Sequence, residues 1–153
     1  MQVSGSVLVK ATPAQAADAL RDAGLLGSVI PACRSIRATG ENSYEIRLDY
    51  YGPVKLGMDV ALSYTPNPDG SFDVVLRAGN MITGRVNSRT QLGLQPDPKG
   101  CLLSWSGSIE ATGLAGRMLA GQAARLSART NRMFRELGEK VEARVAAPGT
   151  GTA

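Results

Sequence analysis

Histidine is absent from this chain of 153 residues. Its absence excludes Ser/His/Asp and Cys/His nucleophile systems and any His-ligated metal, and it removes the side chain best suited to proton transfer near neutral pH. Cysteine is scarce as well: Cys33 and Cys101 lie 68 positions apart and form no Cys-x-x-Cys pair. This spacing fits neither a redox motif nor a zinc site. We therefore expect two reduced thiols and no metal.

Long apolar runs are also lacking. No stretch approaches the roughly 20 apolar residues that span a bilayer, and the opening MQVSGSVLVKA does not have the pattern of a signal peptide. We therefore expect a cytoplasmic protein. Aromatic residues make up only 5% of the chain and are not interleaved with a basic patch. Nucleic acid is thus not an expected partner, although the isoelectric point is near 9.4.

Positive charge is distributed unevenly along the chain. Before Arg117, ten basic residues balance ten acidic ones; from Arg117 onward, seven basic residues face three acidic ones, which accounts for the whole net charge of +4. The same segment has the period of one long amphipathic helix, from about Gly113 to Val145. Its apolar sector contains Leu119, Leu126, Thr130, Met133, Leu137 and Val141, with Ala123 and Phe134 at the edge.

The remainder of the chain favours strands. Residues 2–10 alternate apolar and polar side chains, and residues 33–111 do so in about six segments separated by Gly, Pro, Asn and Asp turns. Between them, Thr12, Pro13 and Gln15 form a capping-box pattern for a short helix, and a second short helical segment runs from Leu25 to Ile30. A one-sided antiparallel sheet needs a cover, and only the C-terminal helix is long enough to provide one.

This pattern predicts an α+β fold, with seven antiparallel strands wrapped around a long C-terminal helix and two short helices after the first strand. We expect a single domain over residues 1–145 and a disordered tail over residues 146–153, AAPGTGTA, which has nothing to bury.

Three short motifs carry a resemblance to a known family. They are Ile30-Pro31-Ala32-Cys33, Gly52-Pro53-Val54-Lys55, and Thr112-Gly113-Leu114-Ala115-Gly116 at the start of the long helix. Together with the order of elements, they resemble the carbon monoxide dehydrogenase G-subunit family, which is part of the START-like (SRPBCC, helix-grip) superfamily, over about residues 1–140. Ala32 stands where the family pattern usually has glycine.

The resemblance implies a non-catalytic accessory protein. It implies a partner enzyme, a molybdenum hydroxylase of the carbon monoxide dehydrogenase type, and docking at the inner face of the cytoplasmic membrane. It also implies a hydrophobic small molecule, a quinone, bound in the cavity of the helix-grip fold, with no other cofactor required.

A ligand cavity between sheet and helix is the first candidate site. Small and weakly polar residues, such as Ser88, Thr90 and Gly107, fall on the apolar face, where a sheet packed directly on a helix would favour large aliphatic ones. An ordinary packed core remains the alternative. The candidate ligand-binding residues are Tyr50, Met58, Leu76, Ser88, Thr90, Trp105, Met118 and Phe134.

The basic face of the C-terminal helix is the second candidate. Arg117, Arg125, Arg129 and Arg132 precede any acidic residue of the helix and could contact an anionic membrane or a partner. The alternative is a solvated helix surface, in which three i, i+4 pairs contribute only tenths of a kcal/mol each. These pairs would be Arg132–Glu136, Arg135–Glu139 and Glu136–Lys140.

Catalysis is the third candidate. Some helix-grip proteins are cyclases or dehydratases, so an enzyme acting on an aromatic or polyketide-type substrate is the alternative function. Candidate proton donors are Tyr44, Tyr50, Tyr64 and Glu110. None has a partner at diagnostic spacing, and an unperturbed tyrosine is a poor base at neutral pH. We therefore assign no catalytic residue.

Overall fold

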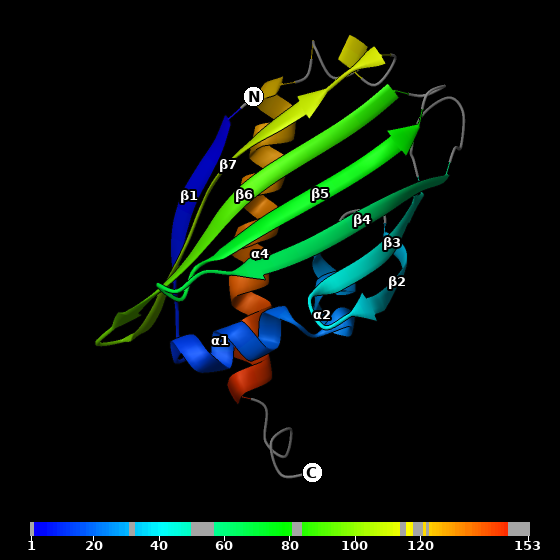
Figure 1. Ribbon diagram of the computed structural model, residues 1–153. Coiled ribbons are helices and arrows are strands. Elements are labelled where there is room, and N and C mark those ends of the chain that lie inside the picture. Colours follow the sequence, from blue (N-terminus) through cyan, green and yellow to red (C-terminus); the bar gives the residue numbers. More distant parts are fainter. Residues whose placement is uncertain are drawn as a thin grey trace.

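The computed structural model describes residues 2–30, 33–49, 57–80, 84–113, 116–117, 121 and 123–146, without the side chains at positions 58, 80, 123 and 126. Seven antiparallel strands form one sheet in the order β1-β7-β6-β5-β4-β3-β2 (Figure 1). The strands are β1 (Gln2–Val9), β2 (Cys33–Gly40), β3 (Ser43–Asp49), β4 (Gly57–Pro66), β5 (Phe72–Asn80), β6 (Gly84–Asp97) and β7 (Gly100–Ala111).

Two short helices, α1 (Pro13–Leu20) and α2 (Ala23–Val29), follow β1. The predicted capping box is present: the Gln15 backbone N–H donates to Thr12 Oγ1, and the Thr12 N–H donates to Gln15 Oε1. Asp22 caps α2, because its carboxylate accepts from the backbone N–H groups of Gly24 and Leu25. The α+β helix-grip architecture is therefore confirmed.

The C-terminal helix is shorter than predicted. Gly113, Gly116 and Arg117 are helical, but Gly121 adopts a turn, and α4 begins at Ala123 and runs to Ala146. The expectation of one continuous helix from Gly113 is thus wrong, because the glycine at 121 makes the helical conformation costly in this stretch. Ala146 is helical rather than part of a tail, and residues 147–153 lie outside the described residues.

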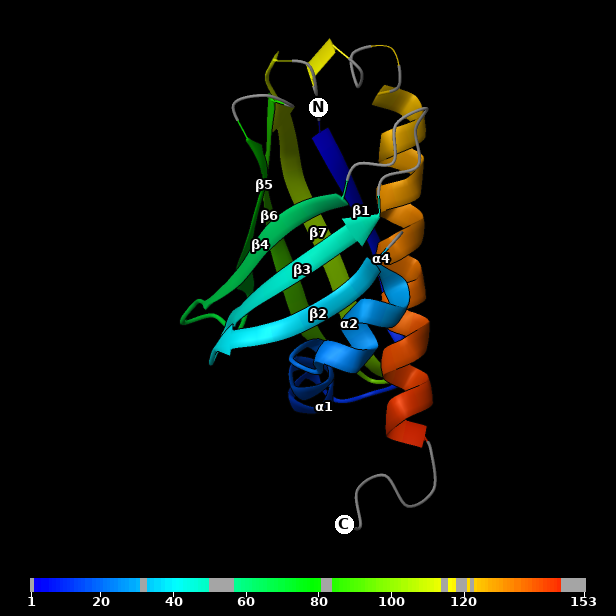
Figure 2. The ribbon, with the colours of Figure 1, turned by 90° about the vertical axis from the view of Figure 1, so that its right-hand side faces the viewer.

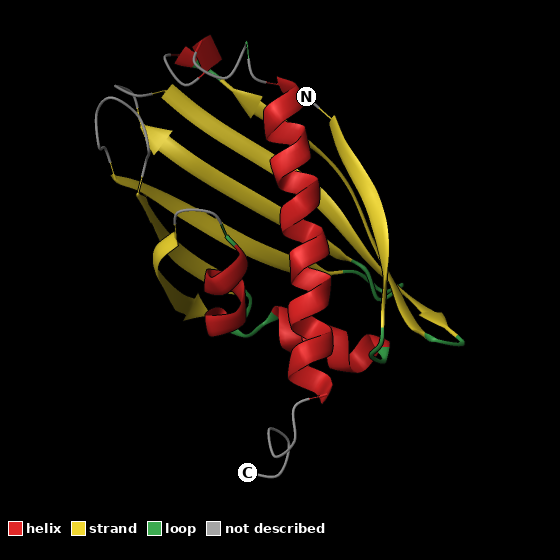
Figure 3. Ribbon diagram, turned by 180° about the vertical axis from the view of Figure 1, so that it is seen from behind, coloured by secondary structure: helices red, strands yellow, loops and turns green. Residues whose placement is uncertain are grey.

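Helix α4 crosses one face of the sheet, called the inner face below (Figures 2 and 3). The sheet curves so that its two edges bend toward the helix while the central strands stand away from it (Figure 2). Among the described residues, the close backbone approaches of α4 are to β1, α2 and α1. Gly138 is buried against β1, where an added Cβ would lie 3.0 Å from Val7 Cγ1. The missing side chain lets the helix lie close to the sheet.

Candidate functional site

Strand pairing assigns every second residue of the central strands to the inner face. Ser88 of β6 lies opposite Leu76 of β5 on one side and Ile109 of β7 on the other. Thr90, two residues further along β6, lies opposite Val74 and Gly107. The alternation in the sequence thus places Leu76, Ser88, Thr90 and Trp105 on the face that α4 covers.

A polar and aromatic contact joins the sheet to α4 at mid-height. The Trp105 indole stacks on the Phe134 ring with centroids 5.0 Å apart, and its Nε1–H donates to Asn131 Oδ1 over 2.9 Å. Trp105 is only 2% exposed. Towards α1, the core below this contact is tightly packed, with Leu103, Leu137 and Val141 almost fully buried.

Above the Trp105–Phe134 contact, the inner face is less completely covered. Four residues that face α4 remain half-buried although they lie in the middle of the sheet: Leu76, Val86, Ser88 and Ile109. Met133 of α4 is half-buried as well. We call the region between these inward-facing residues and α4 the inner space.

The structure separates the eight predicted ligand-binding residues. Leu76 and Ser88 border the inner space, and Trp105 and Phe134 form its lower boundary. Thr90 is 5% exposed, and its hydroxyl lies against the backbone of Gly107, where an added Cβ would be 2.5 Å from Thr90 Oγ1. Tyr50 and Met118 lie outside the described residues, as does the side chain of Met58.

Asn131 was missed by sequence reasoning. Its amide is half-buried and takes a fixed orientation, because an indole N–H is only a donor and must meet the amide oxygen. The sequence contained one indication of this role: Asn131 lies between Thr130 and Met133, two residues of the predicted apolar sector of the helix.

Among the described candidate proton donors, Tyr44, Tyr64 and Glu110 do not form an acid–base group, and Tyr50 lies outside the described residues. The Tyr44 hydroxyl donates to the backbone carbonyl of Arg21 over 2.6 Å, and its ring packs edge-on against Tyr64. Burial raises the pKa of both tyrosines above the ordinary value of 10, with a smaller opposing effect of Arg21 on Tyr44. Glu110 is exposed on the outer face, away from α4. Neutral phenols with raised pKa values are poor bases.

Cys101 is buried and Cys33 is half-buried, and burial raises the pKa of each thiol. Within the described ranges, no group of three His, Cys, Asp or Glu residues could hold a metal ion. None of the helices in the same ranges is long and apolar enough to cross a membrane.

The four predicted docking arginines, Arg117, Arg125, Arg129 and Arg132, are all exposed. The three i, i+4 ion pairs considered for this helix are not formed in the described part of the chain. In each pair the nitrogen and oxygen atoms of the two side chains lie more than 4 Å apart. Instead, Arg144 reaches Asp22 over 3.7 Å and donates to the carbonyl of Asp18, which joins the end of α4 to the α1–α2 connection.

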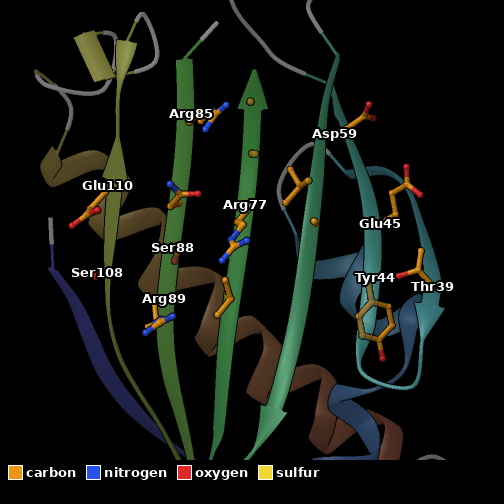
Figure 4. A pocket seen from close by; sticks show the side chains of 16 residues that line it. Thr39, Tyr44, Glu45, Asp59, Arg77, Arg85, Ser88, Arg89, Ser108 and Glu110 are labelled. Atoms are coloured by element: carbon orange, nitrogen blue, oxygen red, sulfur yellow. The ribbon is translucent and has the colours of Figure 1, made fainter. Parts of the chain in front are cut away.

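A groove of about 980 Å³ lies on the outer face of the sheet, opposite α4 (Figure 4). Of the five predicted ligand-binding residues whose side chains the structure describes, Leu76, Ser88, Thr90, Trp105 and Phe134, only Ser88 borders it. Most of its lining points away from α4, including Glu45, Asp59, Ala61, Val75, Arg77, Gly79, Arg85, Asn87, Arg89, Ser108 and Glu110. The alternation in the sequence indicates only that this face is the wet side of the sheet, and it does not predict a groove there.

Solved structures share this architecture at low sequence identity. A conserved protein from Geobacillus kaustophilus matches with a TM-score of 0.73 and 23% identity, over 94% of this chain and 97% of that one. A STAR-related lipid transfer protein from Xanthomonas axonopodis matches at 0.58 and 17%, over 89% and 84%. The di-domain ARO/CYC protein BexL matches at 0.60 and 14%, over 96% of this chain and 50% of BexL.

These likenesses establish the fold alone, and it is shared by proteins of different function. No curated protein matches the chain. The family model of the carbon monoxide dehydrogenase G subunit (CoxG) matches residues 5–145, from the first strand to the last turn of α4. The chain therefore belongs to the CoxG family, that of the carbon monoxide dehydrogenase G subunit.

Proposed function

We propose that this protein is a non-catalytic binding protein for a hydrophobic, planar small molecule, which it holds in the inner space. The observation that carries the proposal is the incomplete burial of the inner face above Trp105 and Phe134. Leu76, Val86 and Ile109 are apolar, face α4 and are only half-buried, whereas a packed core would bury them. Apolar walls with few polar groups are typical of small-molecule sites.

A quinone is the ligand that we propose. The aromatic pair Trp105–Phe134 offers a rigid surface at the lower boundary, and Ser88 offers a hydroxyl beside apolar neighbours. A quinone combines a flat apolar ring with carbonyl acceptors, so it matches both features. Family membership supports this choice, and so does the fold shared with a STAR-related lipid transfer protein.

Trp105 is the only tryptophan of the chain, so its fluorescence reports on this site directly. Titration with menadione should quench it in a saturable way, and organic extraction of the purified protein followed by mass spectrometry should identify a bound quinone. The ligand proposal would be rejected if menadione quenched the protein no more than it quenches free tryptophan and if no quinone were extracted.

We further propose that the protein serves a molybdenum hydroxylase of the carbon monoxide dehydrogenase type. Family membership supports this partner. A tagged full-length chain should co-purify with such an enzyme from its own cells. The accessory role would be wrong if the tagged chain repeatedly purified without a molybdenum enzyme and if the same cells lacked the genes of such an enzyme.

Peripheral docking at the cytoplasmic membrane is part of the same proposal. The arginines at 125, 129 and 132 are exposed along α4, and in the described part of the chain none of them has a carboxylate within 4 Å. Each basic residue near an anionic leaflet contributes about 1 kcal/mol. Replacing these three and Arg117 by glutamine should abolish co-sedimentation with phosphatidylglycerol vesicles, and unchanged co-sedimentation would reject docking through this face.

The cyclase-like alternative is not supported by an observation at the inner space. Tyr44 and Tyr64 are neutral and engaged in packing, and Glu110 lies on the other face of the sheet. Conversion of an aromatic polyketide by the purified protein, with no bound quinone, would nevertheless favour the enzyme over the binding protein.

A further inference from the structure

The outer-face groove carries an unusual concentration of unpaired positive charge. Arg77 of β5 and Arg85 and Arg89 of β6 all line it and are all exposed (Figure 4). In the described part of the chain, none of the three has a carboxylate within 4 Å. Isolated guanidinium groups on neighbouring strands repel one another, so their grouping favours an anionic occupant.

The acidic residues of the groove do not balance these arginines. Glu45 is paired with Arg37, and Asp59 with Arg47 at 3.5 Å, and neither of these two arginines lines the groove. Glu110 is the one lining carboxylate for which the described chain shows no ion pair. The groove therefore presents three unpaired cations against one unpaired anion.

Strand register explains why this surface is recessed. The outward neighbours of Arg77 are Ala61 on β4 and Asn87 on β6, and Arg85 lies opposite Gly79. Small side chains next to long ones leave space between the guanidinium groups. Val75, opposite Arg89, adds an apolar side chain to the lining.

We propose that the outer-face groove binds an acidic polypeptide segment of a partner protein. Arginine suits such contacts because its planar fork binds carboxylates with two parallel hydrogen bonds and because its stem packs on apolar groups. A bilayer surface fits less well, since lipid headgroups lie in a plane whereas these arginines line a recess. The site is on the face opposite to the inner space, so it does not depend on the proposed ligand.

Two variants of equal charge test the proposal. Arg77→Gln/Arg85→Gln/Arg89→Gln alters the groove, and Arg125→Gln/Arg129→Gln/Arg132→Gln removes the same charge from α4. All six arginines are exposed, so both variants should retain the circular dichroism spectrum and melting temperature of the wild type. The probe is a fluorescein-labelled peptide of alternating glutamate and alanine, with a glutamine–alanine peptide as its neutral control.

Fluorescence anisotropy at low salt should show binding of the acidic peptide by the wild type. The groove variant should bind the peptide about tenfold more weakly than the wild type, because it loses three charge contacts that each contribute modestly to the binding free energy. The affinity of the helix variant should fall by less than about twofold. Arg77→Lys, which keeps the charge but loses the fork, should have an intermediate affinity.

Equal losses in the two triple variants would mean general electrostatic attraction and would overturn the proposal. So would absence of binding by the wild type. Loss of phosphatidylglycerol vesicle binding by the groove variant alone would overturn it as well, because the groove would then be a membrane surface.

Discussion

The backbone of Gly5 lies directly against the indole of Trp105: a Cβ at position 5 would be 2.5 Å from Cζ2 and 2.8 Å from Cε2. The two residues are cross-strand partners on β1 and β7. The indole cannot move away, since Phe134 stacks on it and Asn131 accepts its N–H. Glycine at position 5 thus fixes where the aromatic boundary of the inner space lies.

Replacing Gly5 by alanine should therefore destabilise the protein. An added methyl group in a filled core costs about 1 to 3 kcal/mol, measured as the change in the free energy of unfolding in urea. Gly121→Ala is the control without a clash, because nothing lies within 4 Å of its Cβ position, and it should leave stability unchanged or raise it by up to about 1 kcal/mol, since alanine favours the helical conformation. Equal stability of the two variants would show that the indole can move.

Asn131→Leu should remove the acceptor of the Trp105 indole N–H while keeping the size of the side chain. A buried donor without a partner costs about 1 to 3 kcal/mol. We expect a lower melting temperature and a shifted Trp105 emission maximum. Arg132→Leu, at an exposed neighbouring position, should leave both nearly unchanged. A wild-type melting temperature for Asn131→Leu would contradict the role of this hydrogen bond.

Alkaline pH should unfold the protein partly through Tyr64. Burial raises the pKa of Tyr64 in the folded state above its unfolded value near 10. Its contribution is therefore fully present below pH 10 and is lost as the pH rises towards the folded pKa. Between pH 8 and 12, the free energy of unfolding measured in urea should fall less for Tyr64→Phe than for the wild type.

Tyr44→Phe provides the contrast to Tyr64→Phe. It also removes a phenol whose pKa burial raises, but it breaks the hydrogen bond to the Arg21 carbonyl, so it should cost about 1 kcal/mol already at neutral pH. Among the described residues the Tyr64 hydroxyl has no hydrogen-bond partner, so Tyr64→Phe should be nearly neutral there. An identical pH dependence in wild type and Tyr64→Phe would rule out this linkage.

Filling the inner space should block the proposed ligand. Ser88→Phe places a ring between Leu76 and Ile109, and quenching of Trp105 by menadione should weaken by at least about tenfold, or 1.4 kcal/mol. Asn87→Phe is the control, because Asn87 immediately precedes Ser88 in β6 but faces the outer groove. Equal quenching in both variants, with folding intact, would place the ligand elsewhere.

Local patterns predicted the elements well. Alternation assigned Leu76, Ser88 and Trp105 to one face because the side chains of a strand point to opposite faces in turn. The Thr12–Gln15 capping box predicted the start of α1, since its hydrogen bonds lie within one turn. The helical spacing of apolar residues was a less reliable guide near Gly121. The spacing continues through this glycine in the sequence, whereas in the structure Gly121 adopts a turn.

Contacts between distant segments required the structure. The space beside Arg77 depends on Ala61 and Asn87, and the position of Trp105 depends on Gly5, one hundred residues away. Such relations depend on the register of strand pairing, which no local pattern contains.

The sequence by itself determined the order of elements, the apolar face of each strand and the concentration of net charge after Arg117, because these follow from nearest neighbours along the chain. Only the tertiary structure decided that α4 lies close to β1 through Gly138, that part of the inner face stays half-buried, and that three arginines share a groove on the opposite face. The physical reason is that packing and charge pairing depend on residues brought together by the fold.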